Sequence, residues 1–224
     1  SQSVNINTYK AFISGNRHAW LNEIKTHESM KISNTGLKLQ RIELYYVYTG
    51  FLLADKNYSE ATKYIQKGET LIDDILKFEP ENASALAFKG SFTGFKIPMN
   101  RLKILQLGNE SFRYLHLAYQ YDPDNLQVLT DLGSALFFTP RIFGGDKMLA
   151  IQHFEKAVKI IEGAQITSYN WKYMNVLTLL ANSYEKTDQV KKADLTYQKI
   201  LKIEPNYLRV KNQLYPAFLK LIKK

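Results

Sequence analysis

The sequence predicts an all-α protein in which antiparallel helix pairs stack in a row, an α-solenoid. Two observations support this prediction. An acidic residue followed by proline recurs along the chain, and small and large apolar residues alternate at helical spacing ahead of each recurrence. A chain that repeats every few tens of residues stacks similar units, because each unit must bury its apolar face against a neighbour.

Three segments of similar sequence mark the ends of repeats. They read LKFEPENA at residues 76–83, YQYDPDNL at 119–126 and LKIEPNYL at 201–208. Proline cannot continue a helix, and an asparagine shortly after it can cap the next one. Pro80 and Pro123 lie 43 residues apart, and Pro205 follows after 82. The second interval spans almost two repeats, so we place an unmarked boundary at Gly163.

The last repeat shows the alternation of small and large residues most completely. Its pattern consists of Leu177, Leu180, Ala181, Tyr184, Ala193, Tyr197, Ile200 and Pro205. This spacing resembles the tetratricopeptide repeat, although Ala181 replaces the usual glycine and Ile200 the second alanine. Close contact of two helices needs small residues opposite large ones, so Ala181 and Ala193 are expected to face Tyr184 and Tyr197.

The earlier repeats carry the same pattern with longer internal turns. The third repeat has Leu132, Gly133, Leu136, Ala150, Phe154 and Ala157, with five extra residues in its turn. The second has Leu86, Gly90, Leu115, Ala118 and Pro123, and the first has Gly50, Tyr58, Ala61 and Ile65, followed by a helix that reaches Phe78. Four helix pairs result.

We therefore predict a single domain over residues 1–224. An N-terminal helix lies in 1–34, the repeats occupy 35–80, 81–123, 124–163 and 164–205, and a capping helix lies in 206–224. We expect the N-terminal helix over Asn7–His27, with Trp20 on its apolar side, and the capping helix over Tyr207–Ile222. Both helices would close the exposed ends of the stack.

A second resemblance lies in RIFGGDKMLAIQHFEKAV at residues 141–158. It is similar to the FGGD signature of exported bacterial tetratricopeptide proteins, which include the T component of TRAP-type transporters. The resemblance implies a transporter accessory. A phosphate cradle at Gly144 and Gly145 is the alternative, but Asp146 would repel the anion and is expected to cap the following helix. The P-loop and G-x-G-x-x-G spacings do not occur.

Composition bears on location and charge. No apolar run approaches the ~20 residues of a membrane span. The chain begins at Ser1, which fits removal of a signal peptide and fits a truncated sequence equally; we expect an exported, periplasmic protein, with the cytoplasm as the alternative. The absence of cysteine excludes disulfides and thiol catalysis. Residues 186–224 hold ten basic and three acidic residues of a chain whose net charge is +9.

The basic segment and the histidines suggest no specific chemistry. Lysines on a solvated helix face account for the charge, so we expect no specific binding of nucleic acid. His18, His27, His116 and His153 show no metal-ligand or catalytic spacing. We predict no catalytic residue, no metal and no cofactor, and hence a protein that is not an enzyme.

The tetratricopeptide resemblance implies that the first helix of each pair lines a concave groove. The implied groove residues are Asn175, Thr178, Asn182 and Lys186, then Gln127, Thr130, Ser134 and Phe138, then Ser84, Ala87, Ser91 and Phe95. The leading hypothesis is a scaffold that binds a peptide or protein in this groove. The alternative is a solute-binding accessory of a TRAP-type transporter. An open channel favours the first, and an enclosed cavity of a few hundred Å3 favours a small-molecule ligand.

Overall fold

The structure, a computed structural model, describes residues 5–32 and 34–223, and every regular element in these ranges is helical. The α-helices are α1 Ile6–Ser14, α2 Arg17–Ser29, α3 Thr35–Ala54, α4 Tyr58–Phe78, α5 Ala83–Phe95, α6 Ile104–Tyr121, α7 Leu126–Phe138, α8 Lys147–Gly163, α9 Trp171–Glu185, α10 Val190–Ile203 and α11 Tyr215–Ile222. Short helical turns occupy Ile97–Met99, Arg101–Lys103, Arg141–Phe143 and Val210–Leu214. Within the same ranges no helix is both long and apolar enough to cross a bilayer.

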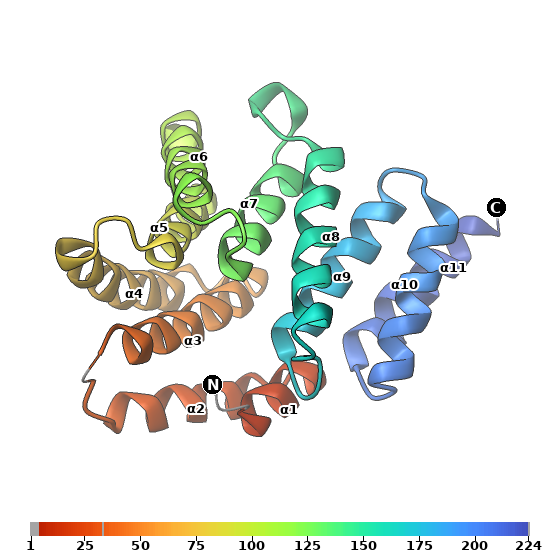
Figure 1. The fold of residues 1–224 in the computed structure, drawn as a ribbon, viewed down its shortest axis with the longest axis horizontal. Helices are drawn as coiled ribbons and strands as arrows, with labels where there is room; N and C mark the ends of the chain where they lie inside the picture. The colour runs from red at the N-terminus through yellow and green to blue at the C-terminus, as the bar shows by residue number, and fades with distance from the viewer. Residues whose placement is uncertain (1–4, 33, 224) are drawn as a thin grey trace.

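Four antiparallel helix pairs stack side by side, which confirms the predicted all-α solenoid (Figure 1). The pairs are α3 with α4, α5 with α6, α7 with α8 and α9 with α10. The first helices of the pairs contact one another in succession, from α3 to α9. These inner helices therefore form one continuous layer, against which the second helices pack.

Asparagine starts most of the helices. The side chains that cap helix N-termini belong to Asn5, Asn16, Asn34, Asn57, Asn82, Asn125 and Asn170. An asparagine oxygen accepts a backbone N–H that the first helical turn leaves without a partner. The expected caps at Asn82 and Asn125 are thus confirmed, whereas Asn206 caps no helix with its side chain.

Small residues lie where paired helices approach most closely. Ala181, Ala193, Tyr184 and Tyr197 are all buried, as the last repeat predicts. A Cβ atom built on Gly133 would lie 2.6 Å from Cε1 of Phe154. Helices α7 and α8 can therefore keep their separation only if this position has no side chain.

The FGGD segment has a structural role as a turn. Gly144 has a φ of +95°, and a Cβ atom on Gly145 would lie 1.7 Å from the carbonyl oxygen of Thr139. Asp146 accepts the backbone N–H groups of Met148 and Leu149 at 2.9 and 3.0 Å, which confirms the expected cap of α8. Both glycines are thus required by the backbone path of the turn.

The prediction of one N-terminal helix over Asn7–His27 is wrong, because this segment forms two helices. Gly15 takes the left-handed conformation with a φ of 64°, which ends α1. Asn16 then accepts the backbone N–H of Ala19 at 2.9 Å and starts α2 in a new direction. Trp20 is fully buried, as expected.

The two N-terminal helices have different neighbours. Helix α2 packs on α3 and covers that end of the stack, as expected, whereas α1 contacts α9 in the last repeat. At the other end the capping helix is present over nearly the expected residues, with a π-helical turn at Val210–Leu214 ahead of Pro216. The proline has no N–H and crowds the preceding turn, which accounts for the wider winding.

A buried carboxylate connects the inner helices. Asp131 of α7 is 2% exposed, and its Oδ1 accepts the hydroxyl of Tyr46 from α3 at 3.1 Å. Ser91 of α5 and Gln127 lie beside it. Its Oδ2 makes no hydrogen bond of good geometry with a described residue. Burial raises the pKa of Asp131 to about 7, which its polar neighbours only partly oppose.

The glycine contacts predict opposite effects for two Gly→Ala substitutions in one helix pair. A Cβ atom on Gly90 would lie 2.7 Å from Cγ of Leu115 and 2.9 Å from the backbone oxygen of Ser111, whereas one on Gly108 would meet nothing within 4 Å. We expect Gly90→Ala to lower the free energy of unfolding by about 1–3 kcal/mol. Gly108→Ala should raise it by about 0.5–1 kcal/mol. Denaturant titration measures both, and equal effects would contradict the close contact of α5 and α6.

Asp131→Asn should change stability in a pH-dependent way. The pKa of the folded state lies above the ordinary value, so folding favours the protonated carboxyl, and the wild-type protein loses stability as pH rises through 7. The amide removes that loss. At pH 8 we expect the variant to be more stable than the wild type by on the order of 1–3 kcal/mol. The difference should vanish near pH 4, and a constant difference in denaturant titrations would show that burial of the charge is not its cause.

Candidate functional site

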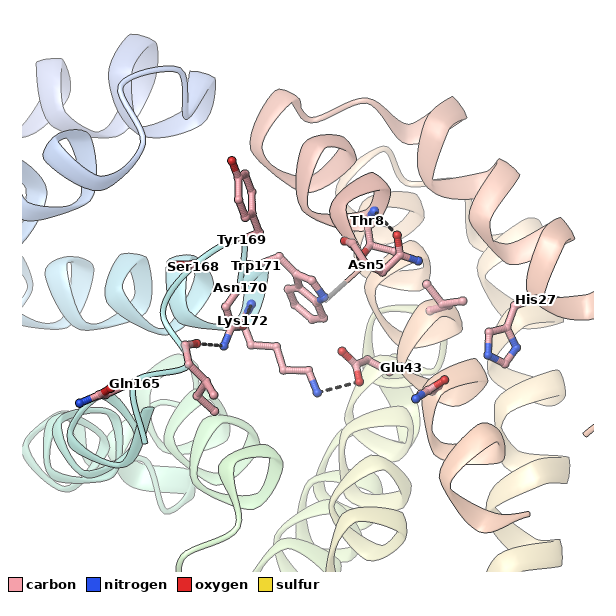
Figure 2. Close-up of a pocket in the computed structure, with 13 residues that line it drawn as sticks. Asn5, Thr8, His27, Glu43, Gln165, Ser168, Tyr169, Asn170, Trp171 and Lys172 are labelled. Carbon is pink, nitrogen blue, oxygen red and sulfur yellow. Dashed lines mark hydrogen bonds and ion pairs between the residues drawn. The ribbon is translucent and has the colours of Figure 1, made fainter. Parts of the chain in front are cut away.

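A partly enclosed cavity of about 500 Å3 lies between the N-terminal helices and the loop that joins α8 to α9 (Figure 2). Its lining residues are Asn5, Thr8, His27, Gln40, Glu43, Leu44, Gln165, Ile166, Ser168, Tyr169, Asn170, Trp171 and Lys172. This volume lies within the range of small-molecule sites, about 300–1,000 Å3. The cavity is therefore the candidate functional site.

Aromatic side chains join the two walls of the cavity. One wall is formed by α1–α3, and the other by the α8–α9 loop and the start of α9. Phe12 of α1 packs on Trp171 with ring centroids 5.2 Å apart and on Tyr207 at 5.8 Å. Trp20 of α2 meets Trp171 edge-on at 5.6 Å. The Tyr9 hydroxyl donates to the Glu204 carboxylate at 3.0 Å. Segments at opposite ends of the chain thus form one site because α1 turns toward the last repeat.

The loop from α8 to α9 is fixed by its own polar contacts. Asn170 accepts the backbone N–H groups of Lys172 and Tyr173, and its amide donates to the carbonyl oxygen of Ile166 at 2.7 Å. Gln165 and Tyr169 take left-handed backbone conformations, with φ of 56° and 48°. Such conformations are uncommon for these residue types and persist only when surrounding contacts hold them. The loop therefore presents Ile166 and Tyr169 to the cavity in defined positions.

An ion pair joins the two walls. Lys172 Nζ of α9 lies 2.7 Å from Glu43 Oε2 of α3, as Figure 2 shows. Both side chains are largely withdrawn from solvent, so each charge needs the other. The pair contributes no net charge to the cavity.

The His27 ring has a nitrogen, Nε2, that no described residue bonds with good geometry. Arg41 donates from Nε to Nδ1 of His27 at 3.2 Å, so the neutral ring carries its proton on Nε2. Burial lowers the pKa of His27, which favours the neutral ring. Nε2 is buried and makes no hydrogen bond of good geometry with a described residue, although Gln40 lies beside it. A buried donor of this kind can serve a ligand oxygen.

The groove residues implied by the sequence lie elsewhere. None of the nine main groove candidates lines the cavity. These candidates are Asn175, Thr178, Asn182, Lys186, Gln127, Thr130, Ser134, Phe138 and Phe95. Thr178 is 3% exposed, and Ala87 is fully buried. Asn182 Oδ1 accepts the Tyr197 hydroxyl at 3.1 Å. Thr178 and Ala87 therefore belong to the packing of the stack, whereas Asn182 is half-buried and bonds to the second helix of its own pair.

Other inner-helix side chains also bond within the chain. The hydroxyls of Thr130 and Ser134 donate to carbonyls of their own helix at 2.7 Å. Ser84 accepts the Asn125 amide at 3.0 Å, and Phe95 stacks on Tyr46 with centroids 5.2 Å apart. Asn175, Gln127 and Ser91 are half-buried, whereas Lys186 and Phe138 are exposed.

The histidines do not assemble a metal or catalytic group. His18 and His116 are exposed, and His153 is buried edge-on against Tyr119 at 5.1 Å. No cluster of three or more metal-ligating side chains occurs in residues 5–32 and 34–223. His27 and Glu43 share the cavity, but Arg41 and Lys172 already engage them.

Comparisons with known proteins point to the fold. No protein-family model and no curated protein sequence matches this chain. A similar solved structure is that of the HusA haemophore from Porphyromonas gingivalis, with a TM-score of 0.62 and 18% sequence identity. The match covers 81% of this chain and 92% of HusA. At this identity the likeness extends to the helical architecture, which the two proteins share over most of their lengths.

Proposed function

We propose that this chain is a non-enzymatic binding protein that holds a small amphipathic ligand in the cavity between α1–α3 and the α8–α9 loop. The cavity itself carries the proposal: it has the volume of a ligand site, and its wall exposes more apolar than polar surface. A partly enclosed volume of this size favours a small ligand over an extended peptide.

The lining indicates the chemistry of the ligand. Trp171, Tyr169 and Ile166 offer apolar surface to a flat or aromatic moiety. The Lys172–Glu43 pair is neutral as a whole, so the cavity does not select a highly charged ligand. The Nε2–H group of His27 would donate to one ligand oxygen, such as that of a carboxylate. An apolar, flat molecule with one or a few acceptor groups meets these conditions.

The haemophore likeness supports a tetrapyrrole as the first ligand to test. In the tautomer that Arg41 imposes, His27 would donate to a carboxylate of such a ligand rather than coordinate its iron. Metal-free porphyrin should then bind about as well as haemin. Export from the cell, which the FGGD resemblance suggests, fits a carrier of this kind, as does the role of a transporter accessory.

A peptide or protein partner in the concave groove is our second candidate. Lys186 and Phe138 stay exposed and are available to such a partner. Crosslinking in cells would identify it. Loss of the crosslink in Asn175→Ala/Lys186→Ala, with no loss in Ile166→Glu, would favour the groove over the cavity.

Ligand binding in the cavity can be measured by tryptophan fluorescence. Trp20 and Trp171 are the two tryptophans of the chain: Trp171 lines the cavity, and Trp20 is buried against it with ring centroids 5.6 Å apart. We expect haemin, metal-free protoporphyrin and anilinonaphthalene sulfonate to quench their emission. Ile166→Glu places a carboxylate in the apolar wall and should weaken binding about tenfold or more, which corresponds to ~1.4 kcal/mol.

Ile203→Glu is the matched control. Ile203 is 40% exposed and Ile166 46%, but Ile203 lies on α10 and does not line the cavity. The control should bind like the wild-type protein. Absence of quenching by all three compounds, or equal affinities of the two variants, would contradict the proposal. A strong preference for haemin over the metal-free ring would contradict the role assigned to His27.

A further inference from the structure

The turns inside the second and third helix pairs form an exposed apolar edge. Residues 96–103 join α5 to α6, and residues 139–146 join α7 to α8. The two pairs stack in the same sense, so the turns lie at one edge of the stack, at the top of Figure 1. The most exposed large apolar side chains on or next to these turns are Leu102, Leu105, Phe138, Ile142, Phe143 and Met148. We call this set the turn edge.

The fold does not explain these side chains. Leu102 is 103% exposed and Ile142 is 84% exposed, so neither contributes to the core. Single exposed apolar residues are common on proteins, but a group gathered on neighbouring projections marks an interaction surface. The turn edge is therefore a candidate for contact with an apolar partner.

Positive charge surrounds this apolar group. Arg101, Lys103, Arg141 and Lys147 lie among its residues, and none of them forms an ion pair with a described residue. Asp146 is the one acidic residue on the two turns, and its carboxylate is occupied by the N-terminus of α8. The partner must therefore combine negative charge with an apolar interior.

We propose that the turn edge docks on an anionic lipid surface. Leu102 and Ile142 would enter the interfacial layer, and the four cations would contact headgroup phosphates. Two convex turns that carry aliphatic side chains at their tips suit a deformable layer. A protein partner would instead need two preformed apolar hollows ringed by acidic residues.

The docked orientation leaves the cavity accessible. Helix α8 begins at the turn edge and ends at the loop that lines the cavity. Its 17 residues, at 1.5 Å per residue, span about 25 Å. That distance exceeds the ~20–22 Å thickness of one bilayer leaflet with its headgroups, so lipid at one end of α8 does not cover the cavity at the other. Both sites can be occupied together.

Sedimentation with vesicles tests the proposal on the full chain. The wild-type protein should bind phosphatidylcholine vesicles that contain phosphatidylglycerol, bind pure phosphatidylcholine weakly, and lose affinity as salt is added. Leu102→Asn/Ile142→Asn should lower the partition coefficient about tenfold. Arg101→Gln/Lys103→Gln/Arg141→Gln/Lys147→Gln should lower it by a similar factor on anionic vesicles.

Two control variants distinguish binding through the turn edge from nonspecific adsorption by other exposed apolar residues and from general attraction by positive charge. Phe78→Asn/Leu195→Asn removes exposed apolar residues elsewhere, which are 74% and 56% exposed. Lys191→Gln/Lys202→Gln/Lys211→Gln/Lys220→Gln removes four cations of the basic C-terminal segment. Both should bind vesicles like the wild type, and circular dichroism checks that every variant stays folded. The proposal is overturned if the wild type binds no vesicles, if the controls lose as much affinity as the turn-edge variants, or if the turn edge captures a protein but no lipid.

Discussion

The contact of Phe12 with Trp171 and Tyr207 is the interaction on which the candidate site depends. A row of helix pairs with free ends would leave the start of α9 exposed and the loop before it without a facing wall. Because α1 folds back onto α9, the inner layer is closed along one side, and a cavity forms where the two walls do not fill the space between them. The Lys172–Glu43 pair then bridges the same walls with opposite charges.

The fold was predictable because its determinants are local in sequence. Pro80, Pro123 and Pro205 each follow a helix end, and Asn82 and Asn125 cap the helices that come next. The small and large residues of the second, third and fourth pairs are buried at the expected positions, since two helices joined by a turn must meet along matched faces. In the first pair Ala61 and Ile65 are buried as expected, but Gly50 is half-buried and Tyr58 is 37% exposed. The pattern of small and large residues predicts the helix pairs but does not establish the family. No family model matches the chain, so the tetratricopeptide relationship stays a prediction.

The site was not predictable, because no spacing connects its parts. His27 and Glu43 come from the N-terminal third, whereas Ile166 of the α8–α9 loop and Trp171 at the start of α9 follow more than a hundred residues later. The Gly15–Asn16 pair was the one local sequence signal for the break between α1 and α2, because glycine ends one helix there and asparagine caps the next. Some inner-helix positions that the family pattern assigns to a groove take part in packing, as Thr178 shows, whereas others, such as Lys186, are exposed. The sequence thus predicts which faces meet within a helix pair but not how the row of pairs closes.

Formation of the cavity wall is coupled to that closure. Helix α1 has nine residues, well below the ~12–15 at which an isolated helix becomes even marginally stable in water. Its helical state must therefore come from its contacts with α2, α9 and Tyr207. A ligand that fills the cavity touches Asn5 and Thr8 on one side and Trp171 on the other. Such a ligand would stabilise α1 and the aromatic contact together, since binding to the closed state alone adds its free energy to that state.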